Sequence, residues 1–167
     1  AMTFCILIVS PFTTVGIGLA IGLSGIGSGA ANLGICAAGF GLAVAGLKVN
    51  SVGTCIAHFI GSPKMSMANV IAKPKILLPM LCSAALLGVL ASVFSIQGTP
   101  ASAGFGFSGL VGPIYALNLM ENGWTAGNIL LVATIFVVAP IIFNIIFIHV
   151  FEKVVQWIQP EDYKLTV

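Results

Sequence analysis

Long apolar runs dominate the chain and predict helices that cross a membrane. No charged residue occurs from residue 1 to residue 47. One helix of that length would measure about 70 Å, roughly twice the hydrocarbon thickness of a bilayer, so the stretch must hold two passes. The natural break is the alternation of glycine and serine over residues 24–29, because each glycine weakens a helix by about 1 kcal/mol relative to alanine. Four spans are predicted, near residues 3–23, 31–47, 76–96 and 126–150.

The segment between the second and third spans is too polar to face lipid. Residues 48–75 hold four of the six lysines and one of the two histidines. Ser62-Pro63 is typical of a helix start and Lys73-Pro74 of a helix end, so a short helix is predicted over 63–72, too short to cross a bilayer. Because lysines concentrate in cytoplasmic loops, residues 48–75 are predicted to be cytoplasmic.

Two other segments lack the pattern of a span. Residues 98–113 are apolar but contain five glycines and two prolines. Such irregular backbone is either an external loop or a re-entrant element buried in protein, because unpaired backbone groups cannot face hydrocarbon. Residues 151–167 begin with apolar and polar positions at helical spacing, which predicts an amphipathic tail at the membrane interface.

Composition supports a membrane protein and excludes other classes. Apolar residues make up 59% of the 167 residues and charged residues 6%, against roughly a quarter charged in soluble domains. Six lysines are too few for a nucleic-acid-binding face, so the expected partner is the lipid bilayer and not nucleic acid. The predicted fold is an all-α, polytopic transmembrane helical bundle with broken or re-entrant helices. Its transmembrane domain covers residues 1–150, and an interfacial tail covers residues 151–167.

The reactive side chains do not form a recognisable catalytic or metal-binding pattern. The four cysteines lie far apart in apolar runs, so neither a metal site nor a disulfide framework is predicted. The two histidines and four acids are also far apart and near predicted membrane edges, so no catalytic triad can be assigned. No cofactor is predicted, and whether the chain is an enzyme stays open.

Two polar clusters inside apolar sequence are candidate binding sites. The glycine and serine break that precedes Asn32 can present backbone groups to a solute, although its GxxxG spacing also fits plain helix packing. In the second cluster, His58 and Lys64 flank the start of the short helix, an electropositive place for a hydroxyl-rich or anionic solute; interfacial loop residues are the alternative. Glu121 is either a solvated turn residue or a ligand of sugar hydroxyls. The candidate solute-binding residues are Ser28, Asn32, His58, Ser62, Lys64 and Asn69.

Three stretches resemble a bacterial membrane family, the phosphotransferase-system EIIC-like proteins of the perfringolysin-regulator type. They are GIGLAIGLSGIGSGAANLG (16–34), GTCIAHFIGSPKMSMANVIAKPKILLP (53–79) and GFGFSGLVGPI (104–114). Relatives are roughly twice as long, so the resemblance implies that the chain is the C-terminal half, and half of an inverted-repeat transporter fold. It implies a plasma-membrane permease that binds and translocates a sugar-like solute with phosphoryl-carrier subunits as partners. The alternative is a non-transporting membrane regulator or scaffold. Self-association into a homo-oligomer is expected from the GxxxG spacing.

Overall fold

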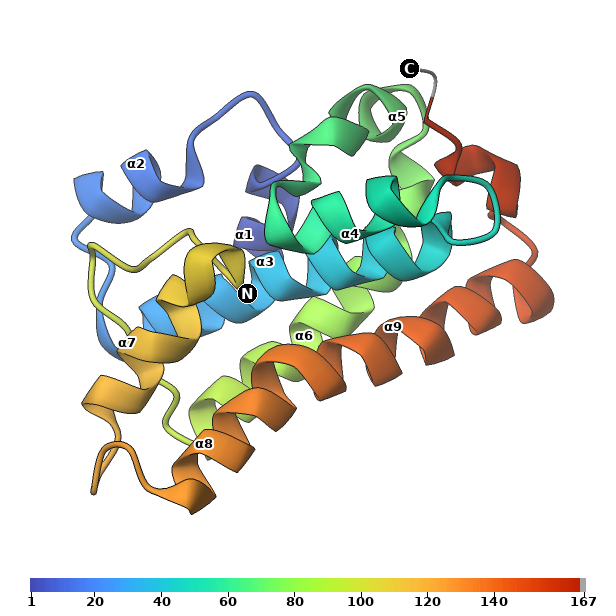
Figure 1. Cartoon of the computed structure of the whole chain (residues 1–167). Helices are drawn as coiled ribbons and strands as arrows, with labels where there is room; N and C mark the ends of the chain where they lie inside the picture. Colours follow the sequence, from blue (N-terminus) through green and yellow to red (C-terminus); the bar gives the residue numbers. More distant parts are fainter. Residues whose placement is uncertain (166–167) are drawn as a thin grey trace.

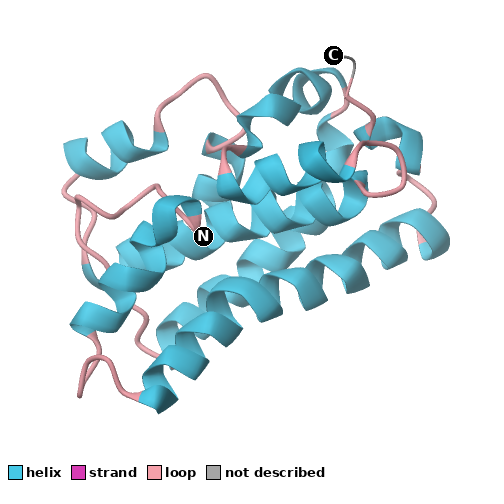
Figure 2. Ribbon diagram, in the orientation of Figure 1, coloured by secondary structure: helices cyan, strands magenta, loops and turns pink. Residues whose placement is uncertain are grey.

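A computed structural model describes residues 1–165 of the chain, and every regular element in that part is a helix (Figures 1 and 2). Three helical stretches are long and apolar enough to cross a membrane. The prediction of an all-α helical membrane bundle is therefore confirmed. The elements are α1 (Met2–Leu7), α2 (Thr14–Ala20), α3 (Gly25–Gly46), α4 (Val52–Ile60), η1 (Pro63–Ser66), α5 (Met67–Ala72), η2 (Pro74–Leu77), α6 (Leu78–Val93), η3 (Ser108–Leu110), α7 (Val111–Leu119), α8 (Ala126–Ala133), η4 (Thr134–Val138), α9 (Ala139–His149), η5 (Val150–Val154) and η6 (Pro160–Tyr163).

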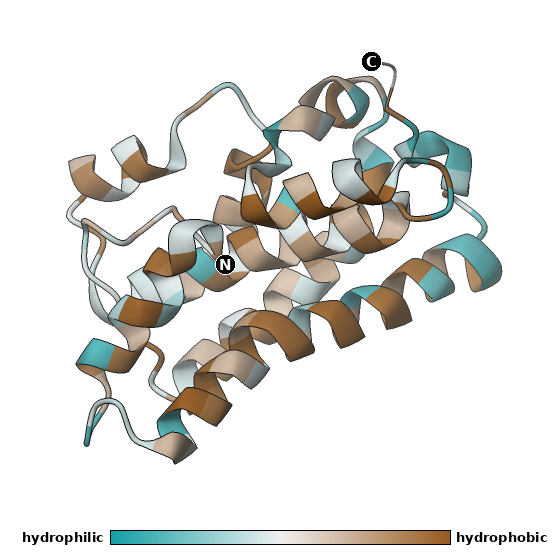
Figure 3. Cartoon of the chain, viewed as in Figure 1, coloured by the Kyte–Doolittle hydropathy of each residue, from teal (hydrophilic) through white to brown (hydrophobic). Residues whose placement is uncertain are grey.

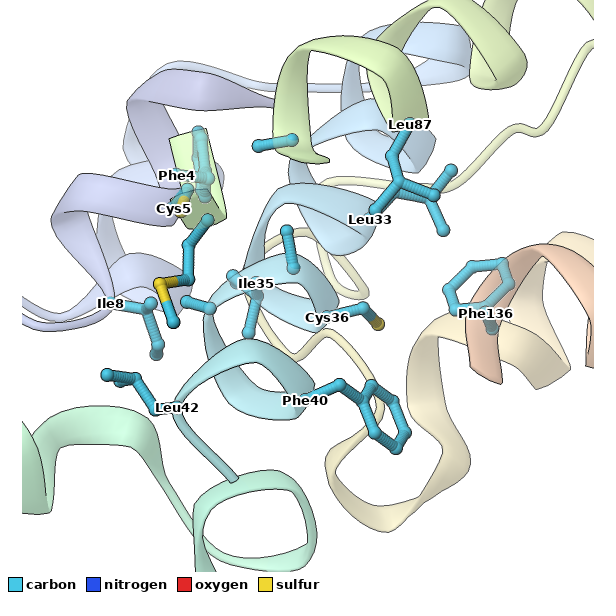
Figure 4. Packing of buried hydrophobic residues seen from close by; sticks show 14 of the residues in the cluster. Phe4, Cys5, Ile8, Leu33, Ile35, Cys36, Phe40, Leu42, Leu87 and Phe136 are labelled. Atoms are coloured by element: carbon cyan, nitrogen blue, oxygen red, sulfur yellow. The ribbon is translucent and has the colours of Figure 1, made fainter. Parts of the chain in front are cut away.

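Helix α3 is the centre of the bundle. Helices α1, α4, α6 and α9 all pack against it, so most of its residues are buried. Figure 4 shows Leu33, Phe40 and Phe136 among the side chains of this core. Small residues on α3 allow close approach: a Cβ on Gly29 would overlap the backbone carbonyl of Ile96. The helix is thus surrounded by protein rather than lipid.

Helices α6 and α9 pack against α3, and the helices α6, α8 and α9 leave apolar side chains exposed on their other sides. Figure 3 shows in brown that α8 and α9 are hydrophobic along most of their length. Such an exposed apolar surface fits contact with lipid tails. Helices α8 and α9 are joined without a break by the π-helical turn η4, and Pro140 is the second residue of α9. The exposed apolar side chains here include Leu86, Val89, Val93, Leu130, Val138, Ile142, Ile145 and Ile146.

The N-terminal region differs from the sequence prediction. Residues 3–23 do not form one span but two short helices, α1 and α2, separated at residues 8–13. Pro11 lacks a backbone N–H and restricts Ser10, which disfavours a continuous helix. Residues 25–29, predicted as a break, instead form the first turns of α3. Contacts with the chain around Ile96 and Gly98 override the low helix propensity of their glycines.

The C-terminal segment also differs from the predicted interfacial helix. Helix geometry continues only to Val154, and the chain then turns at Gln156, which has a φ of 57°. Residues 160–165 fold back on η2, where Tyr163 is buried and its hydroxyl donates to the Ile76 carbonyl at 3.0 Å. Asp162 accepts from the Lys73 ammonium at 2.7 Å. The segment therefore contacts the lysine-bearing loop.

Candidate functional site

The irregular segment of residues 98–110, called here the glycine-rich segment, packs against the N-terminal half of α3. Gly98 and Gly25 exchange two backbone hydrogen bonds of 2.8 and 3.0 Å. The Ser28 hydroxyl donates to the Thr99 carbonyl at 2.9 Å, and the Thr14 hydroxyl donates to the Gly104 carbonyl at 2.7 Å. Non-helical backbone at this place is therefore supported by protein partners, as a membrane bundle requires.

Asn32 is the main polar contact between α3 and the glycine-rich segment. Its Oδ1 accepts from the backbone N–H groups of Gly104 at 3.1 Å and Gly106 at 3.0 Å. Both glycines have positive φ, 94° and 62°, a conformation that other residues rarely adopt. Asn32 is 1% exposed, yet its Nδ2 has no hydrogen-bond partner among the described residues. A buried donor without a partner is costly, so this amide is a candidate for binding a solute or a water molecule.

His58 lies on α4 and joins this helix to η1 through a polar contact with Ser66. Its Nδ1 is 2.9 Å from the Thr54 carbonyl and its Nε2 is 2.7 Å from the Ser66 hydroxyl. A carbonyl only accepts, so Nδ1 carries the proton and the neutral ring accepts at Nε2 from Ser66. Burial lowers the pKa of His58, while hydrogen bonds to the backbone of Thr54 and Cys55 oppose the shift. The imidazole is therefore neutral at pH 7.

A small cavity separates His58 from the glycine-rich segment. It is lined by His58 and Phe59 of α4, by Ile35 and Gly39 of α3, and by Phe107 and Ser108. The space open to the centre of a water molecule is about 10 Å³, which holds one water and not a sugar ring. The Ser108 hydroxyl closes one side by donating to the Gly61 carbonyl at 2.9 Å. The rings of Phe40, Phe59 and Phe107 form one cluster, in which the centroid of Phe40 lies 4.7 Å from Phe59 and 5.5 Å from Phe107, and those of Phe59 and Phe107 lie 6.4 Å apart.

The other candidate residues contact the protein's own backbone. The Ser62 hydroxyl caps η1 by accepting from the Lys64 N–H at 3.2 Å. The Lys64 ammonium donates to the carbonyls of Ser10 and Phe12 at 2.7 and 2.6 Å, which holds the break between α1 and α2. The Asn69 amide donates to the Lys164 carbonyl at 2.7 Å. The Lys64 and Asn69 side chains thus join distant segments, whereas Ser62 makes a local cap.

The structure therefore brings the six candidates into four groups rather than one. Ser28 and Asn32 hold the glycine-rich segment, and His58 lies across the small cavity from that segment. Ser62 and Lys64 lie at the start of η1, and Asn69 contacts the C-terminal segment. Sequence reasoning did not select the hydroxyl partners Thr14, Ser66 and Ser108. Thr14 and its acceptor are separated by 90 residues and Ser108 and its acceptor by 47, so no local pattern points to either.

Comparison with known proteins gives one match. A family model described as "Phosphotransferase system, EIIC" matches residues 1–165. No curated protein and no solved structure matches the chain.

Proposed function

The chain belongs to the phosphotransferase-system EIIC family, and on that premise we propose that it takes part in moving a sugar-like solute across the plasma membrane. It is a membrane protein with three helical stretches able to span a bilayer. In this proposal residues 48–75 face the cytoplasm, partner subunits carry out the phosphoryl chemistry, and the chain assembles into a homo-oligomer. The solute contacts are assigned to Asn32 and His58.

The observation that carries the proposal is the packing of the glycine-rich segment against Asn32 inside the bundle. Transporters bind solutes where helices are interrupted, because the interruption frees backbone and side-chain polar groups. Here the glycine-rich segment is the non-helical chain between α6 and α7, and it packs on α3 so that the Asn32 amide nitrogen is buried without a partner among the described residues. His58 faces a small cavity bounded by the same segment. A sugar hydroxyl would supply the missing acceptor for Asn32.

The small cavity is too small for a sugar, so solute binding at this place requires the glycine-rich segment to move. The hydrogen bonds that would break are those from Ser28, Thr14 and Ser108 and the two accepted by Asn32. Each contributes about 1 kcal/mol net. We call the site formed by Asn32 and His58 the inner site, and in this structure it is closed to a sugar.

A binding experiment with a matched control tests this function. The purified chain in detergent is melted with and without glucose, galactose, N-acetylglucosamine or cellobiose. A sugar at 100 times its Kd should stabilise the protein by about 2.7 kcal/mol. Asn32→Ala should reduce this stabilisation, whereas Asn144→Ala should lower the melting temperature and keep the stabilisation in full. Asn144 is the control because it is also fully buried and its Oδ1 also lacks a partner among the described residues, but it lies in the bundle core, where its amide donates to Ala37, Ser83 and Pro140.

Two outcomes would contradict the proposal. If none of the four sugars stabilises the wild-type chain, the transport function is not supported and the regulator or scaffold becomes the better reading. If Asn32→Ala fails to fold, His58→Gln, measured in the same way, tests the site instead. Unchanged sugar stabilisation in a folded His58→Gln protein would remove the inner site from the proposal.

A further inference from the structure

A second and larger cavity lies at the end of the bundle where α6 and α7 end and α8 begins. Its volume is about 550 Å³, within the range of about 300 to 1,000 Å³ that is typical of small-molecule sites. In Figure 1 this end lies at the lower left, away from α5 and the C-terminus. The polar side chains that line the cavity are those of Ser95, Gln97, Glu121, Asn122 and Asn128. We call it the mouth cavity.

The mouth cavity is formed where the chain enters and leaves the irregular part of the fold. One wall is Ser95 to Gln97, and the next residue, Gly98, pairs with Gly25 and begins the glycine-rich segment. The opposite wall is the turn after α7, the helix that follows that segment. Ser95 and Asn122 have positive φ values of 49° and 64°, so both walls are sharp turns in the left-handed region. The mouth cavity thus borders both ends of the segment.

The side chains of the mouth cavity suit a hydroxyl-rich ligand. Gln97 is partly buried and Glu121 is exposed, and both side chains line the cavity without a hydrogen bond to another of the described residues. An amide both donates and accepts, as sugar hydroxyls do, and a carboxylate accepts a charge-assisted hydrogen bond from a hydroxyl. Asn128 is used differently: its amide donates to the carbonyls of Glu121 and Gly123 at 2.9 and 2.8 Å and fixes the turn.

Charge further restricts the ligand. Glu121 is the single charged side chain on the lining described, and none of the six lysines is part of it. A phosphorylated sugar would meet a like charge without a compensating cation, whereas a neutral sugar would not. The lysines Lys48, Lys73 and Lys75 instead pair with acids of the C-terminal part of the chain.

We infer that the mouth cavity is a docking site for a neutral, unphosphorylated sugar, held by Gln97 and Glu121. The inference rests on the proposed function, because it places a first docking position on the path of the same solute. It adds a site outside Asn32 and His58, formed by the two turns that border the glycine-rich segment.

The test measures sugar affinity with variants of the mouth cavity. Glucose, galactose, N-acetylglucosamine, cellobiose and glucose 6-phosphate are titrated calorimetrically into the full chain in detergent. The double variant Gln97→Ala, Glu121→Ala should weaken the binding of a neutral sugar tenfold or more, as expected when hydrogen bonds that include one to a charged group are lost. Its melting temperature without sugar should not change, because neither side chain contacts another polar group of the described residues. Glu161→Gln, at the other end of the chain's fold and also exposed, is the matched control and should bind like wild type.

The outcomes separate this inference from the proposed function. A neutral sugar that binds the double variant as tightly as wild type, but no longer binds Asn32→Ala, overturns the docking site and leaves the permease function in place. Tighter binding of glucose 6-phosphate than of glucose also overturns the docking site, because the ligand class would be wrong. If no sugar binds the wild-type chain, both proposals fail together.

Discussion

Replacing Gly106 with alanine measures how tightly the glycine-rich segment is packed against α3. Gly106 has a φ of 62°, and a Cβ there would lie 2.5 Å from Cγ2 and 2.8 Å from Cβ of Ile35. Gly123 is a matched control: its φ is 53°, but a Cβ would have no neighbour within 4 Å. The left-handed conformation should cost alanine roughly 1 to 2 kcal/mol at either position. Only Gly106→Ala adds overpacking, which typically costs about 1 to 3 kcal/mol.

The two variants should therefore differ in unfolding free energy by about 1 to 3 kcal/mol, with Gly106→Ala the less stable. For a chain of this length the difference corresponds to a melting temperature about 3 to 9 °C lower. Both proteins are melted in the same detergent, followed by the fluorescence of the two tryptophans. The change in unfolded-state entropy on going from glycine to alanine is shared and cancels in the comparison. Equal losses in the two variants would refute the packing of Gly106 against Ile35.

Two further predictions concern groups outside the spans. Because burial lowers the pKa of His58, the unfolded chain binds a proton more readily than the folded chain. The stability of the folded chain should therefore fall as the pH drops below about 6.5, the pKa of an unfolded histidine. When melting temperatures are measured from pH 7.5 to 5.5, the fall should be smaller in His58→Gln than in wild type. An equal fall in both proteins would assign the pH dependence to other groups. Tyr163→Phe removes the hydroxyl that donates to the Ile76 carbonyl and should cost about 1 to 3 kcal/mol, since that acceptor is buried, whereas Tyr115→Phe should be close to neutral by the same denaturation assay. No loss in Tyr163→Phe would mean that the C-terminal segment does not stay docked.

The long helices could be predicted because their signal is local. An apolar run long enough to cross a bilayer is visible in any window, and the predicted spans near 76–96 and 126–150 lie over the observed stretches Pro74–Val93 and Ala126–Val154. The start of the short helical region at Pro63 follows from a serine cap followed by proline, which involves neighbouring residues only.

The errors arise where distant contacts override local propensity. Residues 25–29 are weak helix formers, yet they are helical because the chain around Ile96 packs closely against Gly29. The break between α1 and α2 depends partly on Lys64, which donates to carbonyls more than 50 residues away. The same limit applies to the candidate site: Asn32 could be selected as an unusual polar residue, but its partners Gly104 and Gly106 could not be identified from spacing.

The glycine-rich segment is the element whose movement would connect the mouth cavity with the inner site. The long helices α3, α6 and α9 share a buried core, and separating them would expose many apolar side chains at about 0.8 kcal/mol per buried CH₂ group. The glycine-rich segment is instead held by side-chain hydrogen bonds, by the two backbone hydrogen bonds between Gly25 and Gly98, and by the packing of small residues such as Gly106, so it buries less apolar side chain than the long helices do. A sugar that supplied replacement partners to Asn32 would offset much of the loss. For a solute that passes from Glu121 toward His58, the segment therefore moves more easily than the helices. A cross-link between cysteines placed at Ser28 and Thr99, in an otherwise cysteine-free chain, should hold the segment in place. It should block passage of the sugar through the inner site without preventing docking in the mouth cavity.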